Sequence, residues 1–452
     1  MEIGLPRFNE VFEKADLPRD HYGPLFEALS ALGTESITRG ISAAYRRLGD
    51  LGATFAADDS DQRVIPVDWM PRILPGDHWE RLSSGLLQRG RAINAWLEAL
   101  YGDGQDVVPD ELVESSVFYR PHTIPQGSSP VRVYGPDVVH MGGGEYVVLE
   151  DNVRVPSGVA YSEAIRRAGM HALPELFQPY RLARIFSYYD ALRRTLEDAA
   201  PDGVDGPNVA VVTRGSGDSA YFEHSRIAEA CGVSLLTLAD CHVRDGEVRA
   251  RSDGRRIDVI YRRFDEDYVD TDLPELKNVY LEGRVGFVNG FGVGVADDKA
   301  IFPFVPEMIE AYLGERPILS NAPTYSLAEE ESRAEAMERL PEMVLKPREG
   351  YGAQGLLIGP EAGREEIEDA RRNVRKNPTG FVVQETLEFS THVLDEGSDD
   401  AAEEVFIDLR TFVLPALGYL MPGGLTRVAR PGTRVVNSTA GGGCKDTWVL
   451  EG

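Results

Sequence analysis

The stretch Glu150-Asp-Asn-Val-Arg-Val-Pro-Ser-Gly158 follows a short run of β-branched and aromatic residues, Tyr146 to Leu149, which is predicted to be a strand. In the pattern Glu150-x-Asn152, two oxygen-bearing side chains leave the same face of a strand, because strand side chains alternate with a period of two. Asp137 would add a second carboxylate from an adjoining strand. Mg²⁺ prefers such oxygen ligands together with phosphate and water. The three residues are a candidate metal site; a solvated strand end is the alternative.

Two lysines and a glycine-rich loop form a second group of candidates. Lys346 closes the apolar run Met343 to Lys346, Lys299 closes Asp297-Asp-Lys299, and glycines recur at positions 350, 352 and 355. A glycine-rich backbone can approach an anion closely, and a lysine at a strand end adds a compact charge for phosphate. The loop lacks the GK[ST] sequel of a P-loop, so a flexible surface hairpin is the alternative.

Arg410 and Arg427 form a third group. The chain carries 47 basic and 74 acidic side chains, a net charge of -27, so we expect no nucleic-acid partner and a clustering of any phosphate-binding residues. Both arginines lie within or beside apolar, glycine-flanked segments, where binding of an oxyanion or phosphate is more natural than a solvated face. Arg430 and Arg434 are interpreted as ordinary surface arginines.

A dinucleotide fingerprint follows the strand-like run Val209 to Thr213. Gly215-Ser-Gly-Asp-Ser-Ala220 precedes a predicted helix, and Asp240 lies about two dozen positions further on. The minimum that this pattern supports is a Rossmann-like unit whose helix N-terminus holds an anion, from a nucleotide or from a substrate carboxylate. An NAD-dependent oxidoreductase is therefore an alternative function, although it leaves Glu150 and the two lysines unexplained.

Helical and strand patterns intermingle along the 452 residues, which predicts an α/β or α+β fold of about three structural units. Breaks rich in Pro, Gly or acidic residues lie at 201–207, 314–335 and 395–404, and the last is expected to be exposed. Helices are expected at 86–100, 180–198 and 221–231. Strands are expected at 146–149, 209–213, 234–238, 259–262, 343–346, 381–384, 406–412 and 434–436.

Signals for export or membrane insertion are lacking in the sequence. The first residues, MEIGLPRFNEVFEK, show no basic segment before an apolar run, and the apolar stretch 412–421 is far short of the ~20 residues that cross a bilayer. We therefore expect a cytoplasmic protein with no membrane partner. Cys231, Cys241 and Cys444 are too few and too scattered for a disulfide framework or zinc cluster.

Taken together, these groups resemble the circularly permuted ATP-grasp type 2 family, relatives of the glutathionylspermidine synthase ligase domain. The resemblance runs from about residue 60 to the end of the chain, with its motifs in family order. The matching segments are 150–158, Tyr221-Phe-Glu-His224, Val259-Ile-Tyr-Arg-Arg263, Gly294-Val-Ala-Asp-Asp-Lys299, Leu345-Lys-Pro347, Gly424-Leu-Thr-Arg427 and Gly441-Gly-Gly-Cys-Lys-Asp-Thr-Trp448. One departure is visible, because Cys444 stands where we expect serine.

The order of the motifs implies a permuted fold. An ordinary ATP-grasp chain carries its Glu-x-Asn pair after the lysines, whereas Glu150 and Asn152 precede Lys299 and Lys346. The resemblance thus implies a circularly permuted ATP-grasp fold with a Rossmann-like pre-ATP-grasp subdomain. The expected division is an N-terminal helical segment plus the metal-binding strands in 1–200, the Rossmann-like subdomain in 201–290 and the nucleotide-binding portion in 291–452.

The resemblance also implies a role for each candidate residue. Mg²⁺ would be bound by Asp137, Glu150 and Asn152. ATP would be bound by Lys299, Lys346, the lid residues Gly350, Tyr351, Gly352 and Gly355, and the adenine and ribose hinge Gln384-Glu385. Arg410 and Arg427 would steady the transferring phosphoryl group. The acid or the acceptor substrate would be held by Arg154, Ser157, Glu223 and His224.

The implied activity is that of an ATP-dependent carboxylate–amine ligase. A carboxylate would attack the γ-phosphate of Mg-ATP to give an acyl phosphate, and an amine or thiol would then displace phosphate to give an amide or peptide-like bond. The partners would be small-molecule or peptide carboxylate and amine substrates, which the sequence does not name, and no oligomeric state follows from it. A catalytically silent nucleotide-binding protein is a further alternative.

Overall fold

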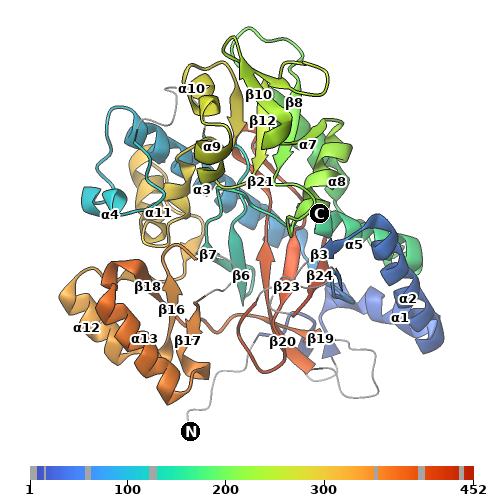
Figure 1. The fold of residues 1–452 in the computed structure, drawn as a ribbon. Helices are drawn as coiled ribbons and strands as arrows, with labels where there is room; N and C mark the ends of the chain where they lie inside the picture. The colour runs from blue at the N-terminus through green and yellow to red at the C-terminus, as the bar shows by residue number, and fades with distance from the viewer. Residues whose placement is uncertain are drawn as a thin grey trace.

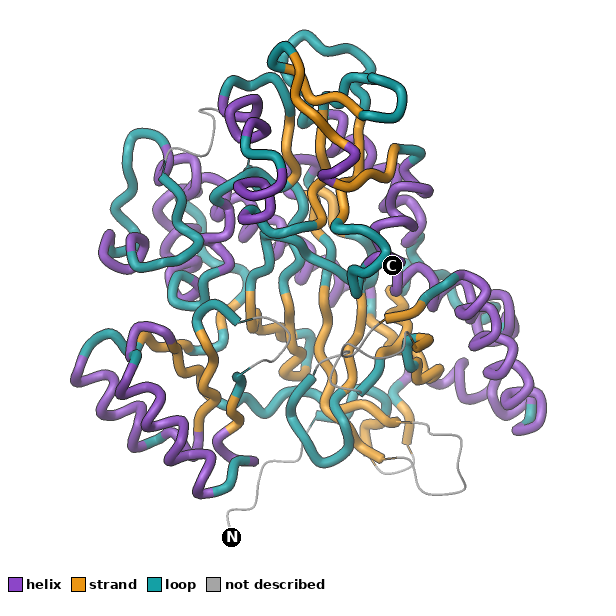
Figure 2. The backbone as a smooth tube through the Cα atoms, in the orientation of Figure 1, coloured by secondary structure: helices purple, strands orange, loops and turns teal. Residues whose placement is uncertain are grey.

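Three β-sheets with flanking helices form the framework of the protein (Figures 1 and 2). The structure is a computed structural model that describes residues 8–14, 17–55, 63–121, 130–350, 355–394, 403–436 and 442–452. Strands and helices alternate over this whole length, which confirms the expected mixed α/β class. Tyr351, Gly352 and most of the acidic break at 395–404 lie outside the described residues.

The largest sheet has eight strands and takes them from distant parts of the chain. Its order is β14-β7-β6-β20-β23-β24-β5, and β19 pairs with β20. The strands are β5 Val67–Leu74, β6 Asp137–Gly142, β7 Glu145–Glu150, β14 Ser320–Asn321, β19 Thr391–Leu394, β20 Glu403–Arg410, β23 Leu425–Val428 and β24 Cys444–Val449. The Glu-x-Asn hairpin β6–β7 thus lies beside strands from the end of the chain, as a permuted chain order requires (Figure 1).

Register in this sheet brings charged residues together. Asp137 on β6 is opposite Glu150 on β7 and opposite Arg410 on β20. Arg427 on β23 is opposite Asp408 on β20. The start of β23 can approach β20 because Gly424 has no side chain; a Cβ there would be 2.4 Å from the carbonyl oxygen of Arg410. Strand pairing alone therefore places two arginines beside two carboxylates.

The second sheet is parallel and has the order β13-β12-β8-β9. Its strands are β8 Val209–Thr213, β9 Ser234–Thr237, β12 Val259–Arg263 and β13 Gly286–Val288. All residues of β8 and β12 are buried, as expected for a parallel sheet covered on both faces. Helices α7 (Tyr188–Glu197) and α8 (Tyr221–Cys231) share one core with the sheet, and α10 (Glu275–Leu281) shares a core on the opposite face.

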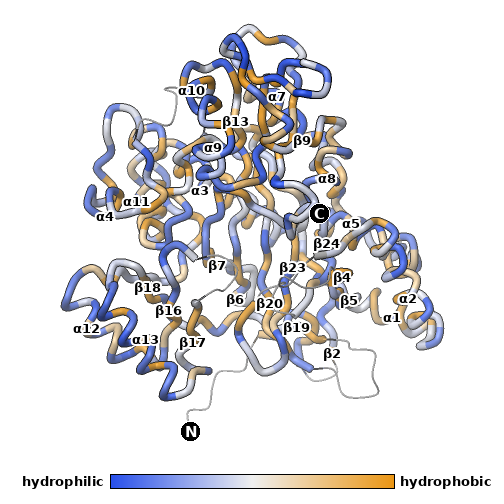
Figure 3. The backbone as a smooth tube through the Cα atoms, in the orientation of Figure 1, coloured by the Kyte–Doolittle hydropathy of each residue, from blue (hydrophilic) through white to orange (hydrophobic). Residues whose placement is uncertain are grey.

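The third sheet is antiparallel, has the order β15-β18-β16-β17, and is packed against α12 (Glu330–Glu338) and α13 (Arg364–Lys376). Its strands are β15 Thr324–Ser326, β16 Met343–Pro347, β17 Leu357–Ile358 and β18 Phe381–Glu385. Figure 3 shows both hydrophilic and hydrophobic stretches along α12 and α13, and the buried side of α13 is formed by Ile367, Ala370 and Val374. This sheet presents Lys346, Gln384 and Glu385.

The remaining elements cover the large sheet and connect the three sheets. The helices are α1 Gly23–Leu32, α2 Thr34–Leu51, α3 Gly76–Tyr101, α4 Asp110–Glu114, α5 Val159–Ala172, α6 Pro174–Phe177, α9 Asp267–Asp272 and α11 Val305–Met308. The short strands are β1 Phe12–Lys14, β2 Leu17–Pro18, β3 Thr54–Phe55, β4 Arg63–Val64, β10 Cys241–Arg244, β11 Glu247–Ala250, β21 Val413–Leu414 and β22 Tyr419–Leu420. Within the described ranges, no helix combines the length and apolar character that a bilayer crossing demands.

Most expected elements are confirmed, with four differences. The helix expected at 86–100 is α3, which begins earlier, at Gly76, and ends at Tyr101. The strand expected at 434–436 is wrong: only a single bridge joins Ala429 and Val436, and the backbone N–H of Arg434 donates to the Glu361 carboxylate instead of to a strand. The helix expected from Tyr180 begins at Tyr188, after a 3₁₀ turn at 185–187. Strand β20 begins before the expected 406–412 and ends at Arg410. The division of the chain at residues 201 and 291 stays a prediction. The large sheet takes strands from both 1–200 and 291–452, so these two segments share one sheet.

Candidate active site

One cavity of about 590 Å³ lies where the three sheets meet. It receives side chains from the large sheet, from β16 and β18 of the third sheet, and from loops that follow β8 and β12 of the parallel sheet. Among the candidates from sequence, its lining contains Asp137, Glu150, Asn152, Arg154, Ser157, His224, Lys299, Lys346, Gly350, Gln384, Glu385, Arg410 and Arg427. Residues almost 300 positions apart in sequence therefore share one wall.

Four candidates need separate mention. Tyr351 and Gly352 belong to the part of the chain that the structure does not describe. Gly355 does not line the cavity. Glu223 lies behind the cavity wall and is fully buried.

Two lysines approach the metal-site carboxylate. The Nζ atom of Lys299 is 3.2 Å from Oε1 of Glu150 and donates a 2.6 Å hydrogen bond to the carbonyl of Gly350, at the start of the glycine-rich loop. The pKa of Lys346 is lowered to about 8, because burial, together with the nearby charge of Lys299, outweighs the opposing attraction of Glu150. These two ammonium groups form a cationic wall suited to phosphate.

Arg410 and Arg427 converge on Asp137. Arg410 donates two 2.6 Å hydrogen bonds, one to each Asp137 oxygen, and an Arg427 nitrogen is 2.9 Å from the same carboxylate. Burial alone would raise the pKa of Asp137, but the two guanidinium groups outweigh burial and bring it to about 2. Arg427 also pairs with Asp408, whose pKa is raised because burial outweighs that pairing. Both arginines are thus held rigidly at the cavity surface.

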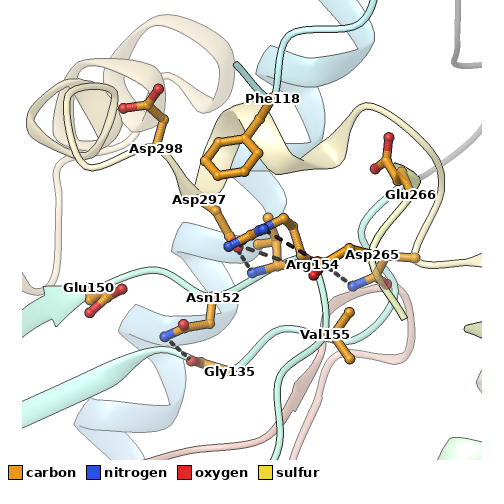
Figure 4. Close-up of polar contacts among 12 residues, drawn as sticks. Phe118, Gly135, Glu150, Asn152, Arg154, Val155, Asp265, Glu266, Asp297 and Asp298 are labelled. Carbon is orange, nitrogen blue, oxygen red and sulfur yellow. Dashed lines mark hydrogen bonds and ion pairs between the residues drawn. The ribbon is translucent and has the colours of Figure 1, made fainter. Parts of the chain in front are cut away.

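Of the three candidate metal ligands, Glu150 and Asn152 fit a hard divalent cation better than Asp137 does. Asn152 donates from Nδ2 to the carbonyl of Gly135 at 3.0 Å, which fixes its amide (Figure 4), and the Glu150 carboxylate is 27% exposed at the cavity. Both oxygens of Asp137 already accept hydrogen bonds from Arg410. No cluster of three or more His, Cys, Asp or Glu suited to a metal occurs in the described residues. Glu150 and Asn152 therefore fit Mg²⁺ if phosphate and water complete the shell.

Arg154 lines the cavity two positions after Asn152. Its Nε donates to Asp297 at 2.6 Å, a terminal nitrogen is 3.4 Å from Asp265, and its guanidinium lies 4.2 Å from the ring centre of Phe118 (Figure 4). Asp297 also accepts hydrogen bonds from the backbone N–H groups of Val153 and Arg154. The Glu-x-Asn stretch is thereby anchored to the segment that carries Lys299.

Arg263 joins the parallel sheet to the Pro-Ser-Gly turn and was given no role from sequence. Its guanidinium donates to Ser157 Oγ at 2.6 Å and to Glu223 at 3.0 Å. The other Glu223 oxygen accepts hydrogen bonds from the N–H groups of Gly158 and Ala160 at the start of α5. Glu223 therefore holds the turn in place and does not face a substrate. Its pKa is raised, because burial outweighs the pairing with Arg263.

His224 is buried and neutral at the edge of the cavity. Burial lowers its pKa to about 2, and the charge of Arg263 acts in the same direction. One ring nitrogen, Nδ1, is 2.8 Å from the hydroxyl of Thr213. The imidazole therefore offers the cavity an uncharged polar edge.

Two further residues depart from their expected roles. Arg434 was predicted to be a surface arginine, which is wrong: its side chain is 18% exposed, pairs with Glu388 at 2.6 Å and lines the cavity. Asp240, the acidic residue of the dinucleotide fingerprint, accepts hydrogen bonds from the N–H and hydroxyl of Thr237 in a local turn. The contacts of Arg434 leave no local signal because Glu361 and Glu388 lie tens of positions away, whereas the contact between Thr237 and Asp240 is a local capping box three residues apart.

The cysteines are unpaired and buried. Burial raises the pKa of Cys444 far above its usual range, and its thiol donates to the carbonyl of Pro66. A buried, protonated thiol is a poor nucleophile, because the thiolate is the reactive form.

The sequence pattern that defines the circularly permuted ATP-grasp type 2 family matches residues 71–429. The chain belongs to this family. The expected resemblance is thereby confirmed, and this ATP-grasp protein is a ligase of a family that generally uses ATP and a divalent metal. The oxidoreductase alternative has no such support.

Similar proteins of comparable length include an uncharacterized protein of Synechocystis, 39% identical over 98% of this chain and 97% of the relative. A protein of Frankia casuarinae, provisionally named glutamate–cysteine ligase 2-2, is 38% identical over 98% of this chain, which spans only 53% of that relative. A solved structure, the apo form of a glutathione synthetase-like effector of Globodera pallida, matches 91% of this chain and 96% of its own with a TM-score of 0.54 at 10% identity. The last likeness concerns the fold alone.

Proposed function

We propose that this ATP-grasp protein joins a carboxylate to an amine and that it does so through an acyl phosphate. The observation that carries the proposal is that Glu150, Lys299 and Lys346 share one cavity with Arg410 and Arg427. An oxygen-ligand pair, two lysines and two fixed guanidinium groups together match the charge of a triphosphate and of a phosphoryl group in transfer.

The nucleotide would lie between the large and third sheets. Lys299 and Lys346 would bind its phosphates, and apolar side chains of Leu149, Val344 and Ile358 would cover its base, since all three line the cavity. Gln384 and Glu385 would contact adenine and ribose; Gln384 is held by Thr324 at 2.8 Å, and Glu385 by Arg339 at 2.9 Å. Mg²⁺ on Glu150 and Asn152 would neutralise charge on the phosphate oxygens.

In the first stage, a carboxylate oxygen of the acid forms a bond to the γ-phosphorus while the bond from that phosphorus to the bridging oxygen breaks, and ADP leaves with the electron pair. Arg410 and Arg427 would neutralise the charge on the phosphoryl oxygens. In the second stage, the amine nitrogen bonds to the acyl carbon, phosphate leaves with the electrons of the C–O bond, and the amine releases protons to phosphate and solvent. The protein positions charges and supplies no covalent group.

Hydroxylamine trapping tests the proposal without knowledge of the amine. The protein is incubated with Mg-ATP, hydroxylamine and pooled carboxylic acids, and hydroxamates are identified by mass. We expect one acid or a small class of acids to give a hydroxamate together with ADP. ADP release with no hydroxamate from any acid pool would contradict the proposal.

Variants connect that reaction to the cavity. We expect Glu150→Ala to abolish hydroxamate formation and Lys346→Ala to weaken ATP binding, while circular dichroism shows both folds intact. Glu35→Gln is the matched control, because Glu35 is exposed on α2 and pairs with Arg39 one turn away. Unchanged turnover in both site variants would refute the assignment.

A further inference from the structure

The parallel sheet has a topological switch point that opens on the active-site cavity. The chain passes from β8 to β9 on one side of the sheet and returns to β12 on the other side of β8. Arg214 directly follows β8, and Phe264 and Asp265 directly follow β12; all three line the cavity. In open α/β sheets, ligands bind in the crevice outside the carboxyl ends of strands at such a point. The cavity therefore continues beyond the region assigned to nucleotide.

Arg214 differs from the other arginines of this cavity. Arg154, Arg263, Arg410, Arg427 and Arg434 each form an ion pair with an Asp or Glu. Within the described part of the chain, no carboxylate forms an ion pair with Arg214. Its guanidinium instead lies 4.5 Å from the ring centre of Tyr268, which orients it without neutralising it. A positioned and uncompensated cation on a cavity wall is suited to a ligand carboxylate.

Carboxylates, of opposite charge to Arg214, line the same cavity. Asp218 and Asp265 line the cavity from the loops after β8 and β12. The Asp218 carboxylate accepts a 2.9 Å hydrogen bond from the N–H of Ala220, and Asp265 is 55% exposed although a nitrogen of Arg154 is 3.4 Å away. Neutral His224 also lines the cavity. A zwitterion carries one carboxylate and one ammonium group. Arg214 has the charge that complements the first, and Asp218 and Asp265 have the charge that complements the second.

We infer that the crevice between β8 and β12 binds the amine substrate, and that this amine is an α-amino acid. Arg214 binds its carboxylate, and Asp218 and Asp265 attract its amino group. This inference rests on the proposed ligase function. The crevice is assigned to the amine for two reasons. The amine nitrogen must reach the acyl carbon from a side that the nucleotide leaves open. The crevice belongs to the parallel sheet, which carries none of the residues assigned to the nucleotide.

The test separates the two halves of the reaction. With the acid found by hydroxylamine trapping, ADP release is followed with pooled L-amino acids and with the matched pool of L-amino acid amides. We expect the amino acids to be accepted and the amides to be poor acceptors. Arg214→Gln should raise the KM for the accepted amino acid about tenfold or more, because a charge-assisted hydrogen bond is lost. The rate of hydroxamate formation should stay within about twofold of that of the unaltered protein. Arg214→Lys should recover part of the loss.

Arg244→Gln is the matched control, because Arg244 is an exposed arginine of the same subdomain on β10, away from the cavity. Equal use of amino acids and amides by the unaltered protein would overturn the inference alone. So would a fall in hydroxamate formation in Arg214→Gln as large as the fall with amino acids, since Arg214 would then serve the acid or the nucleotide. Absence of hydroxamate in the unaltered protein would instead overturn the proposed function, and the inference with it.

Discussion

Asp137 and Arg410 face each other across the paired strands β6 and β20, and the guanidinium of Arg410 holds both carboxylate oxygens at 2.6 Å. The two residues are 273 positions apart, and backbone pairing brings them together. Since Arg427 lies 2.9 Å from the same carboxylate, one aspartate orients both arginines. The positions of the phosphate-side cations are therefore set by the sheet and do not depend on a mobile loop.

The first prediction concerns the two hydrogen bonds that Arg410 donates to Asp137. Arg410→Lys replaces a planar two-point contact by a point charge, so one of the two hydrogen bonds to Asp137 is lost and the cation is no longer oriented. We expect kcat for ADP release to fall about 10- to 100-fold, the equivalent of ~1.5–3 kcal/mol, with the Kd for ATP changed by less than about threefold. Arg430→Lys, at an exposed position just after β23, the strand that pairs with β20, is the control. An unchanged kcat in Arg410→Lys would mean that Arg410 only supports the fold.

The second prediction is a pH dependence of nucleotide binding. Because the pKa of Lys346 is lowered to about 8, its ammonium form is present below pH 8 and is lost as pH rises through 8. The charged form binds phosphate, so affinity for ATP should fall between about pH 7 and pH 9, approaching tenfold per pH unit above pH 8. Binding of a non-hydrolysable ATP analogue by calorimetry measures this directly.

Lys346→Arg provides the matched comparison, because arginine stays protonated throughout this range. Its affinity should be nearly constant from pH 7 to pH 9, even if it is weaker at every pH. A parallel fall of affinity in both proteins would show that some other group titrates.

The metal and phosphate residues could be predicted from sequence because their signals are local. The Glu-x-Asn spacing on a strand, and a lysine followed by a glycine-rich loop, state their chemistry within a few residues. Lys346 and Glu150 were found in this way, and both line the cavity. The order of these motifs also indicated the permuted fold, which the pairing of β6 with β20 bears out.

The residues that sequence reasoning missed depend on long-range partners. Arg263 ends the motif Val-Ile-Tyr-Arg-Arg263, but only tertiary structure shows that it binds Ser157 and Glu223. Arg434 looked like a surface residue because its segment is polar, yet its partners Glu361 and Glu388 come from elsewhere in the chain. Charge pairing between distant segments leaves no periodic pattern, so such contacts cannot be predicted from one sequence.

The third prediction concerns Glu10, which lies outside the family match and supports the active site from behind. Its carboxylate accepts hydrogen bonds of 2.8 and 2.6 Å from Arg72, and Arg72 also donates to the backbone carbonyl of Asp408, the partner of Arg427. Both side chains are buried, so Glu10→Gln leaves an uncompensated guanidinium in the interior. We expect the free energy of unfolding to fall by about 3–5 kcal/mol in urea titrations, with some loss of turnover.

The same pair predicts how stability depends on pH. Burial would raise the pKa of Glu10, but Arg72 and His140 outweigh it and hold this pKa well below its usual value of 4.5. The stabilisation is therefore fully present above about pH 4.5 and is lost as pH falls toward the lowered value. In Glu10→Gln this part of the acid dependence should vanish, whereas the exposed control Glu13→Gln should unfold like the unaltered protein. Equal stability of the two variants at pH 7 would show that the Glu10–Arg72 pair does not anchor the strand that carries Asp408.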